Sequence, residues 1–423
     1  MEELLKNARR KAGTLATLSS CCGVTGETVL TDSAVIMIFA ASLGAGDMLS
    51  LISTSMLPFF NGLLILPGAM LALKVGQRRL ILLSCAAAFC AYLLAVCAPF
   101  AGQWAVAVLL GAILCFTLCT PGFIACWNPL LDSFLTAEER VPFLGKMRFL
   151  HQASAITFLF LTGFLIGKEP SIRDLQIVLL LGALIFAGRG ISIACIPDFG
   201  VRSNRIHIKE SLGKILSSGG MISFGIYQFI LNLMLYGSLP VAILYMKNHL
   251  HLSGSSVILI SNAGLVGMLC GYLAANRLRN RVPIRCAFIV LHFAAIGFNL
   301  LLCLIRSASM PELVIFTVLL WLLGFLIAAS SVYCSAETME LAPPDNKVVA
   351  MAWSCAFFYC GSGCSRLFSS FLLHNEIFRS GKLWGTFLPG FTAYQALFFL
   401  YGVLLIPLIA LLYRIPAVTG KKG

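Results

Sequence analysis

Two carboxylates and one guanidinium lie in stretches that are otherwise apolar enough to cross a lipid bilayer. Glu27 and Asp32 fall in the first such stretch, at about 14–43, and Arg189 falls in the sixth, at about 176–197. A charge at the centre of a membrane-spanning helix costs about 2.5–3.5 kcal/mol on insertion scales, so it is usually paired or functional. These three groups are the first candidates for chemistry inside the membrane.

The two carboxylates share one face of the helix that the first stretch predicts. At 100° per residue, an arc of about 160° holds both acids together with three threonines: Thr25, Thr28 and Thr31. An arc of that kind faces a helix bundle or a cavity rather than lipid. We expect Asp32 or Glu27 to bind a coupling proton or a polar solute. The alternative is a structural ion pair, with Arg189 as the counter-ion.

A second group of polar side chains occupies the stretch 218–245. Phe224, Gln228, Asn232 and Tyr236 recur at i, i+4 spacing and therefore share one helix face. Amides flanked by aromatic rings suit a hydroxylated or zwitterionic solute. The alternative is interhelical hydrogen bonding, worth about 0.6 kcal/mol per contact in membranes.

Four further residues inside spans are weaker candidates. Asn61, Asn262 and Trp321 are added to the predicted solute-binding set, with helix packing as the alternative for each. Arg366 lies near the outer end of its span, where its long side chain is expected to reach the lipid headgroups. The alternative for Arg366 is attraction of an anionic solute.

The elements that must position these residues are long apolar helices. The chain has 423 residues, of which 59% are hydrophobic and 11% charged, whereas soluble domains carry about 25% charged residues. A spanning helix needs about 20 apolar residues. Twelve stretches meet that length, which predicts an all-α membrane protein: 14–43, 48–72, 80–98, 104–127, 148–167, 176–197, 218–245, 253–276, 283–305, 312–336, 348–373 and 391–413.

The basic residues predict the topology and exclude a nucleic-acid partner. The net charge is +13, and 22 of the 30 Lys and Arg residues fall in segments that are cytoplasmic if the N-terminus is cytoplasmic. This split follows the positive-inside rule, so both termini are expected in the cytoplasm. The basic start resembles a signal peptide, but its length and the spans that follow favour a retained helix. The sequence has no Asn-x-Ser/Thr acceptor, which favours a bacterial inner membrane.

The chain divides into two halves that repeat. The polar segment 198–217 is predicted to be a cytoplasmic linker between six-helix bundles at 1–197 and 218–423. The loops after the second and eighth spans match at an offset of about 203, which pairs Gly68 with Gly271, Lys74 with Arg277 and Arg78 with Arg281. Parallel repeats of this kind occur in transporters whose solute site lies near mid-membrane.

On these residues the chain resembles the major facilitator superfamily. The resemblance rests on Lys74-x-Gly76-x-Arg78-Arg79, on Leu-Gly-Ala-Gly-Asp at 43–47, and on Trp-Asn-Pro-Leu-Leu-Asp at 127–132 with the basic residues after it. It implies two pseudo-symmetric bundles of six helices around a central cavity lined by the first helix. It also implies a set of loop and gate residues: Lys74, Gly76, Arg78, Arg79, Asp132, Arg140, Arg148, Arg277 and Arg281. A solvated loop is the alternative for the gate residues.

The sequence departs from the family pattern at two places. The acidic residue of the first loop motif is replaced by Leu73, and Asn276 occupies the matching place in the second half. The Gly-Pro pair of the family's antiporters is missing from the fifth span. The first departure predicts a different cytoplasmic latch, and the second favours uptake over drug–proton exchange.

The resulting expectation is a secondary transporter that moves a small polar solute by alternating access, by proton-coupled import. The rivals are an uncoupled facilitator or exporter of the same fold, and a receptor or assembly protein that transports nothing. No nucleotide-binding loop occurs, and the six histidines are scattered along the chain, so neither ATP hydrolysis nor another enzyme activity is expected. We expect no metal, no cofactor and no nucleic-acid partner, and a monomer in the lipid bilayer.

Overall fold

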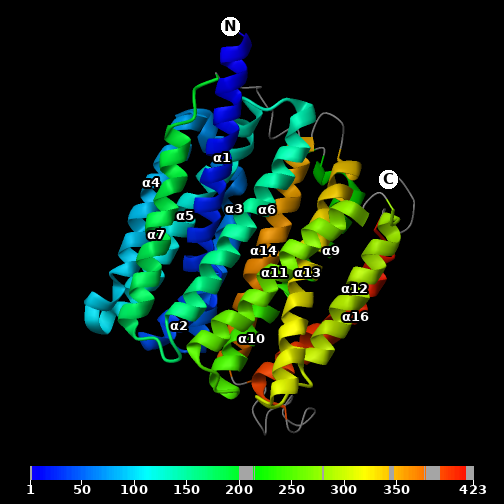
Figure 1. Ribbon diagram of the computed structural model, residues 1–423. Coiled ribbons are helices and arrows are strands. Elements are labelled where there is room, and N and C mark those ends of the chain that lie inside the picture. The colour runs from blue at the N-terminus through cyan, green and yellow to red at the C-terminus, as the bar shows by residue number, and fades with distance from the viewer. Residues whose placement is uncertain are drawn as a thin grey trace. The chain divides into compact units, whose positions relative to one another are not determined.

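The protein is described by a computed structural model that covers residues 2–199, 213, 215–278, 281–342, 347–375, 377 and 391–415 (Figure 1). Within these ranges the chain is helical throughout and contains no strand. Most of the predicted linker, 198–217, lies outside the described residues, as do the side chains of Leu73, Arg140 and Asn276.

The helices form two compact units. Unit 1 comprises residues Met1–Ala45 and Leu63–Arg205, and unit 2 comprises Gly46–Gly62 and Ile206–Gly423. The helices of unit 1 are α1 (Glu2–Thr31), α2 (Ala34–Ser42), α4 (Gln77–Val96), η1 (Ala98–Trp104), α5 (Ala105–Asp132), α6 (Ala137–Leu165) and α7 (Ile172–Ala194). Those of unit 2 are α9 (Gly219–Leu235), α10 (Ser238–Leu244), η2 (Tyr245–His249), α11 (Gly254–Leu278), α12 (Ile284–Leu302), α13 (Met310–Leu341), α14 (Lys347–His374) and α16 (Ala393–Leu412).

Helix α3 (Asp47–Val75) is divided between the two units. Its first half, to Gly62, packs with unit 2, and its second half, from Leu63, packs with unit 1. The sequence placed all of this helix in the first half of the chain, so the contacts assign residues 46–62 differently from the predicted division.

Most of these helices are long and apolar enough to span a membrane. Among the described residues, ten helical segments meet the length and composition of a span. Two further helices, α6 with 29 residues and α14 with 28, are long enough but more polar. Gln152 of α6 and Ser354, Ser365 and Arg366 of α14 are nevertheless buried. Polar residues of a spanning helix face the protein interior, so these two helices complete the predicted set of spans.

Local sequence signals begin several of the helices. A threonine or serine accepts a hydrogen bond from the backbone three residues on, and that residue's side chain bonds back, which forms a capping box. This pattern begins α6, α7 and α16, with the pairs Thr136–Glu139, Ser171–Asp174 and Thr392–Gln395. Between α3 and α4 the chain turns at Gly76, whose φ of +91° is readily adopted only by glycine.

In unit 1, α1 packs between α6 and α7, and α4 packs against α5 and α7. Three aromatic rings fill the core where α4, α5 and α7 meet. The ring centroids of Tyr92, Phe116 and Phe186 lie 5.2–6.1 Å apart, within the range of favourable aromatic contacts. This core supports the face of α7 that carries Arg189.

In unit 2, α11 packs closely against α13, α9 against α14, and α12 against α13 and α16. Glycines permit the closest approach: a Cβ on Gly267 would lie 1.9 Å from the carbonyl oxygen of Trp321. Small residues at helix contacts are the usual means of close packing in membranes. His292 is fully buried and links three helices, because its ring nitrogens lie 3.3 Å from Tyr227 Oη and 2.9 Å from the Leu405 carbonyl oxygen.

The two units share details that a repeat predicts. The first span of each is interrupted at equivalent positions: α1 ends at Thr31 and α2 begins at Ala34, while α9 ends at Leu235 and α10 begins at Ser238. Each of these pairs is offset by 204. The fold class predicted from the sequence, an all-α membrane protein of two pseudo-symmetric halves, is confirmed.

The repeated glycines also make equivalent contacts. A Cβ on Gly68 would lie 2.9 Å from the carbonyl oxygen of Pro121, and one on Gly271 would lie 2.6 Å from that of Phe325. Pro121 and Phe325 are themselves 204 residues apart. The matching loops noted in the sequence therefore follow helices that pack in the same way.

Candidate functional site

The most unusual feature of unit 1 is the interruption of its first span at Asp32 and Ser33. The sequence predicted one continuous helix over 14–43; the structure shows that α1 ends at Thr31 and α2 starts at Ala34. Nearby side chains compensate the helix end: the Thr31 hydroxyl donates to the Glu27 carbonyl oxygen at 2.7 Å, and the Ser33 hydroxyl to that of Val29 at 2.9 Å. Hydroxyls that bond to the backbone in this way compete with regular helix geometry.

Asp32 is exposed at this interruption. Residues 19–40 are all described, and Asp32 alone among them is exposed; every residue of α2 from Ala34 to Ala40 is buried. A carboxylate in a spanning helix does not face hydrocarbon. Asp32 therefore faces a polar or aqueous region at the place where the helix is broken.

Glu27 lies one and a half turns earlier and is paired within unit 1. Its Oε2 accepts a hydrogen bond from Nη1 of Arg189 at 2.9 Å. The Arg189 side chain is 3% exposed and that of Glu27 is 24% exposed. The structure thus places Glu27 next to the residue that the sequence offered as its counter-ion, whereas Asp32 is five residues further on.

The pair is held in a fitted environment. The guanidinium carbon of Arg189 lies 4.2 Å from the ring centroid of Phe123 and 5.1 Å from that of Phe186. Contacts of this kind are worth about 2 kcal/mol when desolvated. A Cβ on Gly23 would lie 1.6 Å from Arg189 Nε, so α1 admits the guanidinium only because residue 23 is glycine. The serine hydroxyl of Ser19 also donates to the Arg189 carbonyl oxygen, at 3.1 Å.

A second polar seam joins α1 to α6. Ser20 Oγ lies 2.9 Å from Nδ1 of His151, and Thr25 Oγ1 lies 2.9 Å from Ser154 Oγ. The polar arc predicted on the first span is therefore split between two neighbours. Of the residues in that arc, Thr25 contacts α6 and Glu27 contacts α7.

In unit 2, Gln228 is one end of a hydrogen-bonded chain. Ser354 of α14 donates to its Oε1 at 2.8 Å, and Thr338 of α13 donates to Ser354 at 2.9 Å. All three side chains are buried. The chain links α9, α14 and α13, which is the arrangement expected of interhelical hydrogen bonding.

The other three residues of the predicted stripe do not converge on one space. Asn232 donates to the Gln228 carbonyl oxygen of its own helix at 2.7 Å. Phe224 is buried against Phe288 of α12, and Tyr236 follows the end of α9 and packs edge to face on Phe358 of α14. The stripe is interrupted because α9 ends at Leu235.

The remaining predicted solute-binding residues are Asn61, Asn262 and Trp321. Asn61 and Asn262 are both buried. Trp321 stacks on Phe325 and lines an open, almost wholly apolar groove on α11 and α13 with Ala263, Val266, Thr317 and Val318. A groove of that composition suits lipid chains better than a polar solute.

The expectation for Arg366 is wrong. The side chain does not reach the headgroup region; it is 2% exposed and donates through Nη1 to the carbonyl oxygen of Thr54. That carbonyl needs a donor because the residue four positions later in α3 is Pro58, which has no N–H. Arg366 thus serves a backbone group that a proline leaves free.

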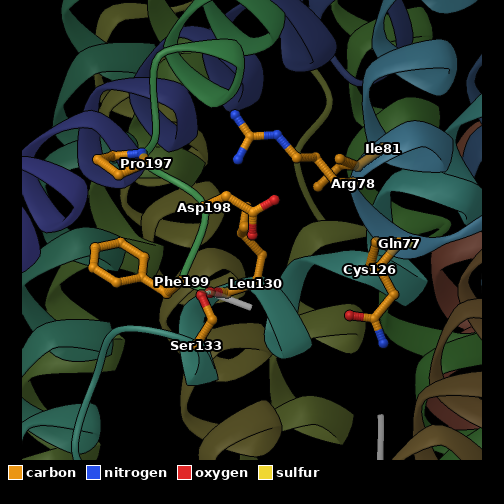
Figure 2. A pocket seen from close by; sticks show the side chains of 9 residues that line it. All are labelled: Gln77, Arg78, Ile81, Cys126, Leu130, Ser133, Pro197, Asp198 and Phe199. Atoms are coloured by element: carbon orange, nitrogen blue, oxygen red, sulfur yellow. Dashed lines mark hydrogen bonds between the residues drawn. The ribbon is translucent and has the colours of Figure 1, made fainter. Parts of the chain in front are cut away.

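One residue of the loop motif has a definite structural task. Arg78 Nη2 donates to the carbonyl oxygens of Ala194 and Ile196 at 3.2 and 2.9 Å, so it caps the end of α7. Cations at helix C-termini are favourable. Figure 2 shows the Arg78 side chain extending toward the chain at Pro197, with Asp198 beside it.

The cavity beside Arg78 is small. It has a volume of about 20 Å³ and is lined by Gln77, Arg78, Ile81, Cys126, Leu130, Ser133, Pro197, Asp198 and Phe199 (Figure 2). That volume holds about one water molecule. This cavity is therefore not a solute-binding site.

The other loop and gate residues are at the surface. Gly76 forms the turn between α3 and α4, Lys74 and Arg79 flank it exposed, and Asp132, Arg148, Arg277 and Arg281 are also exposed. The side chain of Arg140 lies outside the described residues.

Sequence reasoning missed three buried polar residues. Glu337 is 2% exposed because α13 continues to Leu341, beyond the predicted end at 336. Thr338 and Ser354 complete the Gln228 chain. Helical spacing was the available signal, since Glu337 and Thr338 continue the pattern of α13 without a proline or glycine. Among the described residues, no group of three His, Cys, Asp or Glu side chains is placed to hold a metal ion.

Comparisons with solved structures identify the fold. A POT family transporter in complex with 5-aminolevulinic acid aligns with a TM-score of 0.71 at 12% identity, covering 97% of both chains. A bacterial homolog to the human lysosomal transporter Spinster aligns at 0.68 and 15%, covering 98% of both. FucP, a major facilitator superfamily transporter, aligns at 0.61 and 11%, covering 95% of this chain and 97% of that one.

These likenesses extend over almost the whole chain but concern the fold alone, because the identities are low. No family model matches the chain, and no curated protein matches it.

Proposed function

We propose that this chain, which has the fold of major facilitator superfamily transporters, is a secondary transporter that moves a small polar solute by alternating access. The main support is the interruption of the first span of unit 1, where Asp32 is exposed among buried residues. Discontinuous spanning helices place polar side chains and free backbone groups at mid-membrane, where transporters bind solutes and ions. The solved structures with this fold are transporters of varied solutes, which supports the same class of activity here.

We assign the coupling role to Asp32 rather than Glu27. Glu27 already has a cation at 2.9 Å within its own unit, and proton binding would break that pair. Leaving a buried guanidinium without its partner costs about 3–5 kcal/mol. Asp32 is exposed, which allows a proton to arrive and leave.

We propose no direct contact of Gln228 or Asn232 with the solute. Gln228 accepts a hydrogen bond from Ser354 and so positions α9 against α14. Asn232 donates to the backbone of α9 itself, just before the interruption at Tyr236 and Gly237. We assign four other residues to helix packing, because two are buried amides and two pack on aromatic rings: Asn61, Asn262, Phe224 and Trp321. We therefore assign the solute-binding surface of unit 1 to the interruption of its first span at Asp32 and Ser33, and not to the predicted stripe.

The proposal includes proton-coupled import by a monomer in a bacterial inner membrane with both termini cytoplasmic. The absence of a Gly-Pro pair in the fifth span and the distribution of basic residues support it. An uncoupled facilitator is the alternative. It gains support from the Glu27–Arg189 pair, in which one of the two acids already has a counter-ion.

The test starts from binding. Purified protein is melted in the presence of a panel drawn from the solutes of the structural neighbours: a nucleoside, a short peptide, fucose and 5-aminolevulinic acid. A solute that binds the folded protein stabilises it by about 2.7 kcal/mol at one hundred times its dissociation constant, and this stabilisation raises the melting temperature. The solute that does so is then followed in proteoliposomes by counterflow.

A transporter exchanges labelled for unlabelled solute at a rate above that of empty liposomes. Binding without exchange would instead indicate a receptor. Exchange that is unaffected by a proton gradient would establish the facilitator. Glu169→Gln serves as a control, because Glu169 is exposed and has no proposed contact with solute or proton.

A further inference from the structure

The motif Leu-Gly-Ala-Gly-Asp at 43–47 ends in a carboxylate that the proposed function leaves unexplained. Asp47 is the first residue of α3 and is half-buried. Both of its carboxylate oxygens accept hydrogen bonds. Asn248 Nδ2 donates to Oδ1 at 2.7 Å, and the Tyr394 hydroxyl donates to Oδ2. Asn248 belongs to η2 and Tyr394 to α16.

The three side chains also contact one another. Asn248 Nδ2 lies 3.2 Å from Tyr394 Oη, so Asp47, Asn248 and Tyr394 form a closed triangle of hydrogen bonds. All three residues belong to unit 2. Hydrogen bonds to an ionised acceptor are roughly twice as strong as neutral ones. The triangle is therefore a strong link between the start of α3 and two other elements of unit 2.

The triangle is one end of a longer set of contacts along residues 47–62. Ser370 donates to the Met48 carbonyl oxygen at 3.1 Å, and Arg366 donates to that of Thr54. Further along, a Cβ on Gly363 would lie 2.6 Å from the backbone of Phe59, so α3 and α14 touch there backbone to backbone. We call these contacts, from Asp47 to Gly62, the α3 seam.

The α3 seam ends where the helix changes units. From Leu63 onward α3 packs with unit 1, although the helix is continuous from Asp47 to Val75. Alternating access requires the two halves of such a transporter to move against each other. Because α3 is attached to both units, that movement must either bend the helix or release the seam.

We propose that Asp47, Asn248 and Tyr394 form a latch that holds the first half of α3 in unit 2 and opens during the transport cycle. The proposal rests on the proposed function for its second clause only. The latch lies at the end of the helix and is built from side chains alone, so it opens first. The close backbone contacts at Gly62 and Gly363 lie furthest from it and open last.

Tyr394 of the latch has an aromatic neighbour in η2. Tyr245 lies beside Tyr394, with ring centroids 6.0 Å apart, and is stacked on His249 at 5.1 Å. Arg306 lies 5.8 Å from the ring of Phe391 and donates from its backbone to Glu312. The carboxylate of Asp47 is the acceptor on which the triangle depends, so loss of its charge is the sharpest perturbation.

The test is amide hydrogen exchange of the full-length protein in lipid nanodiscs, read on peptides from residues 47–62. The variants are Asp47→Asn and Tyr394→Phe, with Glu169→Gln and Tyr413→Phe as matched exposed controls. Losing a hydrogen bond to a charged group is worth about tenfold or more in the opening equilibrium. We expect exchange of residues 47–56 to rise by about that factor in both latch variants and in neither control.

The outcomes of the exchange and counterflow experiments can be told apart. Unchanged exchange in Asp47→Asn and Tyr394→Phe overturns the latch. Exchange that also rises by the same factor in peptides of α12 means general destabilisation and overturns it too. If the wild-type protein transports its panel solute, faster exchange with an unaltered counterflow rate overturns the link to the cycle. If the wild type transports nothing while the exchange result holds, the latch stands and the proposed function fails.

Discussion

Gly23→Ala tests the reasoning about the buried pair in unit 1. The added Cβ would lie 1.6 Å from Nε of Arg189 and 2.2 Å from its Cζ, so the guanidinium must leave its place. A guanidinium at the end of a flexible chain moves easily when it is exposed. Here it is 3% exposed, bonded to Glu27 and stacked on Phe123. The displacement therefore removes contacts that cannot be rebuilt nearby.

The magnitude follows from two opposing effects. Breaking one side of a buried ion pair costs about 3–5 kcal/mol, and alanine gains about 1 kcal/mol over glycine in a helix interior. The net loss is about 2–4 kcal/mol, with the lower end favoured because Glu27 is 24% exposed. Gly13→Ala is the matched control on the same helix, since its Cβ would meet only Phe143, at 3.4 Å.

The assay is the midpoint of unfolding in SDS titrations of the purified protein. We expect a lower midpoint for Gly23→Ala, and an unchanged or higher one for Gly13→Ala. In an Arg189→Ala background the Gly23→Ala change should cost nothing further, because its cause has been removed. Equal midpoints for the two glycine variants would refute the claim that Gly23 is needed to make room for the Arg189 guanidinium.

Three further outcomes follow. Ser354→Ala leaves Gln228 Oε1 buried without its donor, so we expect a loss of about 1–3 kcal/mol in the same titration, whereas Ser223→Ala, whose hydroxyl bonds only within its own helix, should lose little. Hydrogen bonds from Thr136 hold the pKa of Glu139 below its usual 4.5, so the capping box stabilises α6 above that pH and weakens as pH falls through the lowered pKa. The protection of amides at the start of α6, relative to their intrinsic exchange rate at each pH, should therefore fall on acidification in the wild type and stay constant in Glu139→Gln. Pro58→Ala restores an N–H for the Thr54 carbonyl, so Arg366→Met should cost less stability in that background than in the wild type, and an equal cost would contradict the assigned role of Arg366.

The sequence was sufficient for the architecture because membrane helices are specified by simple quantities. Apolar length, the positions of Lys and Arg, and the matched loops at Gly68 and Gly271 predict spans and a repeat without reference to packing. The structure adds that the same two glycines meet Pro121 and Phe325, which are also related by the repeat.

The interruptions in α1 and α9 were not predictable from apolar length. Asp32 is not a strong helix breaker, and the hydroxyls of Thr31 and Ser33 act through their orientation. In the seventh span, Gly237 and Pro240 are the available signal, because Pro240 has no N–H for the Tyr236 carbonyl oxygen. The i, i+4 spacing from Phe224 to Tyr236 was identified correctly, but the neighbours of these residues were not predicted. A helix with partners on several sides sends residues of one stripe to different helices.

Arg366 shows why burial could not be read from position alone. The distance of a residue from a helix end predicts snorkelling when the side chain faces lipid. In this chain a proline in a different helix creates an acceptor, and that acceptor holds the guanidinium inside. Long-range contacts of this kind require coordinates.

The central claim is that the carboxylate at the broken helix couples solute movement to protons. The direct measurement is internal pH in proteoliposomes loaded with a pH-sensitive dye, recorded when the panel solute that stabilises the protein is added outside at equal starting pH. We predict acidification of the lumen with the wild type, and solute counterflow without acidification with Asp32→Asn. Acidification by Asp32→Asn at the wild-type rate would contradict the claim.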